Sequence, residues 1–502
     1  MGHHLPGMIR AYGDRNLFTR FRTRFLVAPI LLLTVSIWSS WYEIQAIQLL
    51  AFGWGIWHGM MQTYGFCRIY DGKASASAAA RARADFWLCA SWFVAAVLLS
   101  PMRFRTLLDL YYESGGPVVP AVAVSVMRLA IMSLLAAVTL FFAWQQWTHW
   151  RSKGWGSPIK ITLLVSSIAF WWYCNNGVQN ILVGIALFEV FHDVQYLSIV
   201  WIYNRSRVER DNSVKGFMRF IFRKSGALIG VYVGLVLAYG SIAFTASGSS
   251  ALWVRHALIG VVTASALLHF YYDGFIWKVR ETQTRSNLGI GTAGIASAQG
   301  RFAWPTWVLH SLRWSALIIP FGLLCSVQLL GRVVPPLERT AKVVEVLPGN
   351  AQAQLNFAEE LHKAGQLDEA IKHYNASLER DGSSARAEYL LGLAYSDQHQ
   401  YDLALKHYEK SISLDPKNAT TEFRLALLLK AFGRPTEARV RLEHVVELDP
   451  KMLPAQVSLG DVLSEEGNYD AAAAHYREAL HLKPDLDAAE RGLAYAESYR
   501  RR

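Results

Sequence analysis

Nine apolar stretches constrain this chain more than any other feature of its sequence. A helix needs about 20 apolar residues to cross the hydrocarbon core of a bilayer. Of the 502 residues, 52% are hydrophobic, and the stretches fill most of residues 25–331. They lie at residues 25–43, 46–67, 85–101, 118–147, 160–175, 177–203, 226–246, 251–277 and 304–331. The pattern predicts an all-α protein that begins with a polytopic membrane helical bundle of about nine transmembrane helices.

The basic residues are distributed unevenly along the chain. Before residue 341 there are 30 Lys and Arg against 13 Asp and Glu, and from there on 20 against 26. If residues 1–24 are a basic cytoplasmic leader, the predicted cytoplasmic segments hold 23 of those 30 positive residues, in accord with the positive-inside rule. This orientation explains the charge better than a nucleic-acid partner, which we do not expect. The prediction is a multi-pass protein of a bacterial inner membrane, in contact with bilayer lipid.

Beyond a predicted linker at 332–349, the sequence repeats every 34 residues. Alanines stand at 370, 404, 438 and 472, and the large residues Tyr374, Tyr408, Leu442 and Tyr476 follow each of them by four. This pattern resembles the tetratricopeptide repeat (TPR) family. The resemblance implies an α-solenoid of four repeats plus a capping helix within residues 350–502, and a protein or peptide partner. Nine crossings would place this domain in the periplasm.

One apolar stretch carries ionisable groups that a lipid-facing helix would not carry. At 100° per residue, Glu189, His192, Asp193 and Tyr196 share one stripe of a helix. A carboxylate that faces hydrocarbon costs about 2.5–3.5 kcal/mol even on the lenient insertion scale. The stripe is therefore predicted to face protein, water or a metal ion.

Two further helices each place a histidine at a similar predicted depth, at His58 and His269. Asp273 follows His269 by one turn, so imidazole and carboxylate groups could reach one ion. Histidine and carboxylate ligands suit non-haem iron, with manganese or zinc less favoured. The predicted metal ligands are His58, Glu189, His192, Asp193, His269 and Asp273, and the predicted catalytic side chains beside them are Tyr196 and Tyr272. The alternative is that these groups are hydrogen-bonded packing residues without a ligand.

Short windows around these histidines resemble the Brp/Blh-type membrane β-carotene dioxygenases. The windows are Trp57-His58-Gly59, residues 191–201 with His192, and residues 268–276 with His269 and Asp273. Tyr196 stands where that family has the second histidine of a pair. The resemblance implies a non-haem iron and a carotenoid-like substrate.

The leading interpretation is an integral membrane, metal-dependent oxidase or oxygenase that acts on a hydrophobic small molecule, a lipid or a carotenoid-like compound. Its TPR domain would recruit a protein partner. A second interpretation, from another class, is a non-catalytic membrane-anchored scaffold or assembly factor. A third is a lipid-linked glycosyltransferase, against which the very short first extracytoplasmic loop argues, since its only acid is Glu43.

Overall fold

The computed structural model describes residues 4–73, 79–153, 157–211, 216–222, 230–231, 233–235, 237–238, 241, 251–276, 282–288, 306–331 and 333–500. Within these residues the secondary structure is helical and contains no strand, which confirms the predicted all-α class. The chain divides into two compact units, Met1–Val334 and Pro335–Arg502. The boundary falls inside the stretch predicted as a linker.

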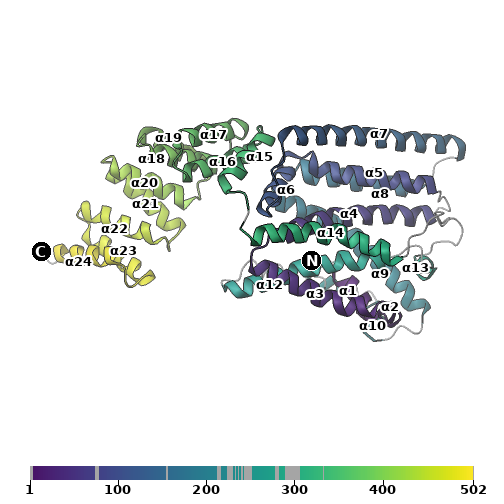
Figure 1. Cartoon of the computed structure of the whole chain (residues 1–502). Helices are drawn as coiled ribbons and strands as arrows, with labels where there is room; N and C mark the ends of the chain where they lie inside the picture. Colours follow the sequence, from purple (N-terminus) through teal and green to yellow (C-terminus); the bar gives the residue numbers. More distant parts are fainter. Residues whose placement is uncertain are drawn as a thin grey trace. The chain divides into compact units, whose positions relative to one another are not determined.

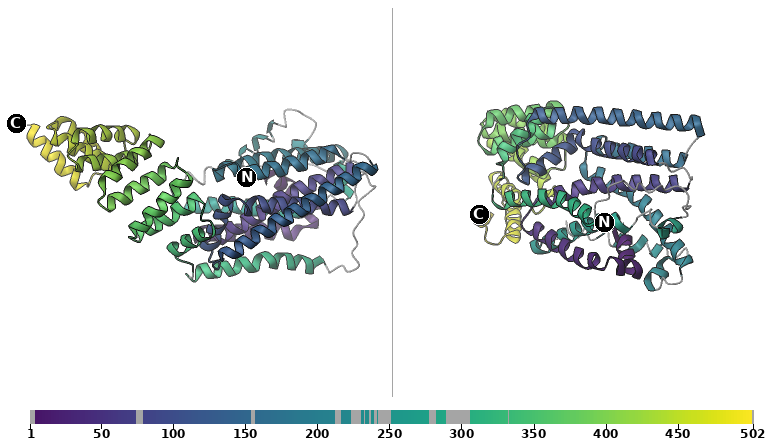
Figure 2. Two further views of the ribbon diagram at one scale, coloured as in Figure 1. Left: turned by 90° about the horizontal axis from the view of Figure 1, so that it is seen from above. Right: turned by 45° about the vertical axis from the view of Figure 1, so that its right-hand side comes forward.

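The first unit is a bundle of helices that run roughly side by side (Figures 1 and 2). In chain order they are α1 (His4–Gly13), α2 (Arg15–Arg20), α3 (Arg22–Trp41), α4 (Ala46–Lys73), α5 (Ala79–Leu98), α6 (Pro101–Glu113), α7 (Ala121–Lys153), α8 (Pro158–Asn176), α9 (Ile181–Arg210), α10 (Gly216–Phe222), α12 (Leu252–Ile276), α13 (Thr282–Asn287) and α14 (Thr306–Leu329).

Four helices among the described residues are long and apolar enough to cross a membrane: α3, α7, α9 and α12. The pair α5 and α6, bent by 79°, could form a fifth span. The predicted spans at 46–67 and 160–175 form α4 and α8. Neither of these helices is apolar enough to be counted with the four. In α4 the reason is polar content, since Gln48, His58 and Gln62 interrupt the apolar run. Most of the predicted span 226–246 lies outside the described residues. The count of nine spans therefore stays a prediction.

Helices α3 and α12 pack closely against each other. A Cβ atom added to Gly260 would lie 2.6 Å from the Cα atom of Ile37, so only glycine allows the two backbones to approach this closely. An aromatic and aliphatic cluster around Phe25, Tyr272 and Phe275 continues the contact toward the other end of α3. This packing holds α12, which carries two of the predicted ligands, against the start of the chain.

A buried network of charges ties α4, α5 and α8 together. Asp85 is fully buried and forms ion pairs with Arg68 and with Lys160, whose Nζ atom lies 2.7 Å from the carboxylate. Asp71 pairs with the same two cations at 2.8 and 3.2 Å. Two cations facing two carboxylates leave no net charge in the protein interior, which makes the burial tolerable.

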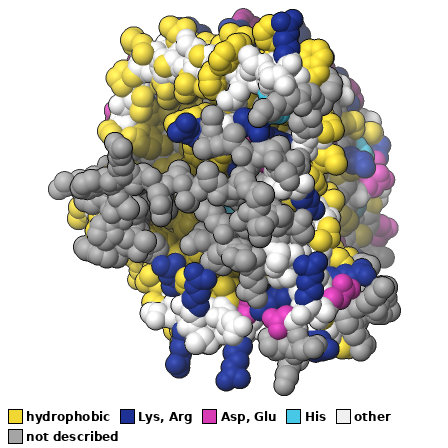
Figure 3. Space-filling view, turned by 90° about the vertical axis from the view of Figure 1, so that its right-hand side faces the viewer, with side chains coloured by type: hydrophobic (Ala, Val, Ile, Leu, Met, Phe, Trp, Pro, Cys, Tyr) yellow, Lys and Arg dark blue, Asp and Glu magenta, His cyan; other side chains and the backbone are white. Residues whose placement is uncertain are grey.

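Basic side chains gather at one face of this unit (Figure 3). The elements that border it are the segments predicted to be cytoplasmic. Among the described residues, the exposed cations on these segments are Arg15, Arg20, Arg22, Lys73, Arg83, Arg151, Arg210 and Arg219. The residues predicted as a basic leader include α1 and α2, which pack onto the bundle instead of extending from it.

The second unit is a series of paired helices (Figure 1). After α15 (Pro336–Val346) come α16 (Ala351–Lys363), α17 (Leu367–Arg380), α18 (Ala385–Asp397), α19 (Tyr401–Leu414), α20 (Ala419–Ala431), α21 (Pro435–Leu448), α22 (Leu453–Glu465), α23 (Tyr469–Leu482) and α24 (Asp487–Arg500). Each pair begins 34 residues after the previous one. The four predicted alanines are fully buried, and the large residue that follows each is at most 2% exposed.

Candidate metal centre and repeat domain

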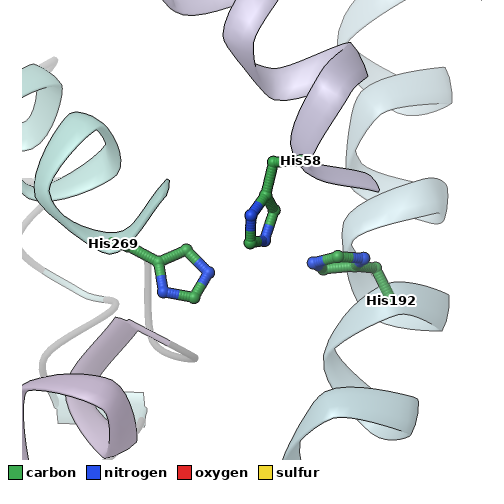
Figure 4. A group of neighbouring side chains, drawn as sticks. All are labelled: His58, His192 and His269. Atoms are coloured by element: carbon green, nitrogen blue, oxygen red, sulfur yellow. The ribbon is translucent and has the colours of Figure 1, made fainter. Parts of the chain in front are cut away.

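Three histidines from distant parts of the sequence converge inside the first unit (Figure 4). His58 comes from α4, His192 from α9 and His269 from α12, and these residues are 8%, 5% and 1% exposed. One ring nitrogen of each lies within 4.8 Å of one nitrogen of each of the others. The structure thus brings together the three histidines that the sequence analysis placed at a common depth.

The donor set suits a transition metal. Imidazole nitrogens bind such ions at about 2.0–2.1 Å, which in tetrahedral geometry sets the nitrogens about 3.4 Å apart. The observed spacing of up to 4.8 Å would close with small rotations of the side chains. Three imidazoles are typical ligands of zinc, copper, iron or nickel. A buried group of this kind can hold a divalent ion and leave a coordination position open.

Asp273 lies beside two of the histidines. Its Oδ2 atom is 3.9 Å from Nε2 of His58 and 3.7 Å from Nε2 of His269. The hydroxyl of Tyr196 donates a hydrogen bond of 3.0 Å to Oδ1 of the same carboxylate. The predicted ligand Asp273 and the predicted catalytic Tyr196 therefore form one hydrogen-bonded pair at the edge of the trihistidine cluster.

Three predicted residues remain. Among the described residues, the group close enough to share an ion consists of the three histidines, so it contains none of the predicted carboxylate ligands Glu189, Asp193 and Asp273. Glu189 and Asp193 are on α9 with His192. The hydroxyl of Tyr272 forms a hydrogen bond of 2.9 Å with that of Tyr12, and its ring packs against Phe25. Tyr272 thus belongs to the aromatic contact between α3 and α12.

Aromatic rings surround the cluster. The ring centroid of Phe270 lies 4.8 Å from that of His58, and Phe188 lies 5.8 Å from His192. A Cβ atom added to Gly59 would lie 3.3 Å from the Phe188 ring, so the glycine beside His58 allows close packing. Such walls exclude water, which strengthens electrostatic interactions inside the site.

A fourth histidine, which the sequence did not predict at the site, lies near the cluster. The ring of His4 stacks on that of His269, with centroids 4.6 Å apart and planes at 22°. Residues 1–24 were predicted to be a cytoplasmic leader, and a leader is not expected to bury His4 against α12. No periodicity in residues 1–24 indicates this contact.

The repeat domain matches known families. Three models described as tetratricopeptide repeat match residues 351–384, 385–418 and 423–487. Residues 351–487 are tetratricopeptide repeats. The predicted solenoid is thereby confirmed. The family matches do not extend to the windows that resemble the membrane β-carotene dioxygenases, so that resemblance stays a prediction.

Several solved structures are similar to part of the chain. YrrB, described as a TPR protein with an unusual peptide-binding site, is 26% identical over 33% of this chain and 85% of its own, with a TM-score of 0.31. A MamA structure is 23% identical over 30% and 86%, with a TM-score of 0.28. PilF of Pseudomonas aeruginosa is 21% identical over 32% and 78%, also at 0.28. No curated protein matches the chain.

Proposed function

We propose that this protein is a membrane-anchored scaffold that binds a protein or peptide through its TPR domain. The observation that carries the proposal is the run of repeats over residues 351–487. TPR arrays offer an extended surface for binding other proteins. Four helices of suitable length and hydropathy in the described part of the chain support the anchor.

The proposed orientation places the basic face of the first unit in the cytoplasm of a bacterium and the TPR domain in the periplasm. The support is the gathering of Lys and Arg side chains on that face (Figure 3), because positive residues near membrane helices are retained on the cytoplasmic side. Residue-specific labelling of cysteines introduced at Lys73 and Glu379 in intact cells tests this. Labelling of both sites by an impermeant reagent would contradict it.

The scaffold proposal is tested by co-purification from the native host. Full-length protein, a variant lacking residues 335–502, and a triple variant His58→Ala, His192→Ala, His269→Ala are purified in detergent after cross-linking. A partner that is retained by the triple variant and lost with the repeats supports the scaffold. A partner that remains bound without residues 335–502 contradicts it.

A second candidate function is a metal-dependent enzyme of the membrane. The trihistidine cluster favours it, because three buried imidazole groups within 4.8 Å of one another suit an ion better than an apolar core. The ion proposed is non-haem iron, which when bound would supply oxygen chemistry toward a lipid or carotenoid-like substrate. His58, His192 and His269 would hold it, and Asp273 would be a further ligand or hold a proton beside it.

Elemental analysis of the detergent-purified protein tests the enzyme candidate. Near-stoichiometric iron that is lost in His269→Ala, while the variant still elutes as a folded monodisperse protein, supports the metal site. Wild-type protein without iron, manganese, zinc, copper or nickel would leave the histidines as packing residues and exclude this candidate. If the metal is present, enzymatic activity in membranes that contain the variant lacking residues 335–502 would separate catalysis from partner binding.

A further inference from the structure

The helix α1 lies directly over the trihistidine cluster. A Cβ atom added to Gly7 would lie 3.4 Å from the hydroxyl oxygen of Tyr196, 3.7 Å from Oδ1 of Asp273 and 3.8 Å from Nδ1 of His269. A methyl group at this position of α1 would therefore be in van der Waals contact with three groups at the site. An alanine would fit here, but a larger side chain would displace either α1 or the site residues.

His4 contacts the cluster from the same helix. It is 4% exposed, and its Nδ1 atom forms a hydrogen bond of 2.9 Å with the hydroxyl of Ser265, one turn before His269 on α12. This bond fixes the His4 ring in its stack on His269. The opposing contacts of His269 are an edge contact with Tyr196 at 5.3 Å and one with His58 at 4.6 Å.

Charged and polar groups hold α1 in this position. Arg10 is 3% exposed, donates a hydrogen bond of 2.9 Å to the hydroxyl of Tyr203 and lies 4.1 Å above that ring. The residue that follows α1, Asp14, forms a buried ion pair with Arg207. Tyr203 and Arg207 are on α9, the helix that carries His192. Burial of an arginine is costly unless its partners compensate for the lost solvation. These contacts therefore fix the position of α1 on α9.

We propose that α1 closes the trihistidine site and that His4 is a positioning residue that fixes the His269 ring. The inference rests on the proposed metal site and concerns how that site keeps its ion. A stacked and hydrogen-bonded neighbour holds an imidazole in one orientation, which favours binding through a fixed nitrogen. A helix that covers the site also keeps water and competing ligands from the ion, so release of the ion requires α1 to move.

Metal exchange in the full-length protein tests this. Purified protein is loaded with Co²⁺, whose absorption bands report its ligands, and the loss of these bands is followed after addition of excess EDTA. The variants are His4→Ala, His4→Phe and Gly7→Leu, with the exposed Arg15→Ala on α2 as the matched control. Groups that orient metal ligands typically change affinity about 10- to 100-fold when removed.

We expect His4→Ala and Gly7→Leu to release Co²⁺ about 10-fold faster or more, while Arg15→Ala matches wild type. His4→Phe retains a stacked ring and should recover much of the slow release. The Co²⁺ spectrum of His4→Ala should also shift, a change that a purely structural role would not produce. Gel filtration shows whether each variant is folded.

Failure of the metal site and failure of the proposed role of α1 give different results. Wild-type protein that binds no Co²⁺ overturns the metal site and with it this inference. Stoichiometric Co²⁺ that leaves Gly7→Leu and His4→Ala at the wild-type rate overturns the role of α1 and leaves the metal site standing. If His4→Ala does not fold, the release rate of Gly7→Leu decides between these results.

Discussion

One partly buried polar pair joins the two helices of each repeat, and its residues are 19 positions apart. The pairs are Gln354 with His373 at 2.6 Å, Glu388 with His407 at 2.7 Å, Glu422 with Arg441 at 3.3 Å, and Gln456 with His475 at 2.8 Å. In the first and last repeats the acceptor is an uncharged amide. Burial there lowers the pKa of His373 and His475 below the ordinary value of 6.5.

The depressed pKa values make the stability of the repeat domain sensitive to pH. The neutral histidine is favoured in the folded state. Its contribution to the free energy of unfolding is therefore complete above pH 6.5 and is lost as the pH falls through the lower pKa of the folded state. We expect the free energy of unfolding of residues 335–502 to decrease from pH 7 to pH 5. Urea unfolding at several pH values measures it. The double variant His373→Gln, His475→Gln should flatten this dependence, and an unchanged slope would contradict the assignment.

Asp85 is the residue on which the charge network of α4, α5 and α8 depends. Replacing it with alanine leaves Arg68 and Lys160 with one carboxylate between them, and breaking a buried ion pair in this way costs about 3–5 kcal/mol. We expect a clear drop in the thermal unfolding midpoint of the protein in detergent. The control Glu209→Gln removes an exposed pair with Arg205 and should change the midpoint little. Equal midpoints for the two variants would argue against the network.

At the scale of elements, the turn between paired helices recurs at residues 365, 399, 433 and 467. Three of these are glycine, with φ between 70° and 81°, and the other is His399 with φ of 62°. A residue with a Cβ atom pays about 1–2 kcal/mol in this left-handed region. His399 recovers part of this cost through a hydrogen bond of 2.8 Å to the hydroxyl of Tyr401.

His399→Gly should therefore stabilise the repeat domain by about 0.5–1 kcal/mol. The reverse change, Gly433→His, places a Cβ atom at φ of 70° in the next repeat and should destabilise by a similar amount. Denaturant unfolding of residues 335–502 compares the two. A loss of stability in His399→Gly would mean that the bond to Tyr401 outweighs the backbone strain.

At the scale of the whole molecule, the second unit has its own core and begins with α15. Val343 and Leu347 of this segment are buried, at 2% and 5% exposure, and Leu337 packs against the cluster of the first repeat. The predicted linker 332–349 thus contains a helix that covers the open end of the solenoid. End repeats of a solenoid need such a cover because they lack a neighbour.

We expect residues 335–502 to fold without the first unit and to unfold in one cooperative transition. A shorter fragment, residues 350–502, exposes the apolar surface that α15 covers and should unfold at a lower temperature. Circular dichroism of both fragments measures this. Equal midpoints would mean that α15 does not contribute to the stability of the repeats.

The repeat domain could be predicted almost completely because its contacts are local. Each helix packs against helices that are near it in sequence, so a period of 34 with buried alanines defines the pairing. The common depth of His58, His192 and His269 was also accessible, since depth depends only on the distance along each helix from its end. These features required no knowledge of how the helices pack.

The sequence by itself therefore determined the all-helical class, the repeats and the common depth of the three histidines. The tertiary structure decided which side chains lie beside them, because a helix can turn about its axis without a change in depth. Asp273 lies within 3.9 Å of two of the histidines, although among the described residues the group close enough to share an ion consists of the histidines alone. The structure also decided that His4 stacks on His269 across 265 residues of chain. Contacts between segments so distant in sequence depend on packing, which no local periodicity encodes.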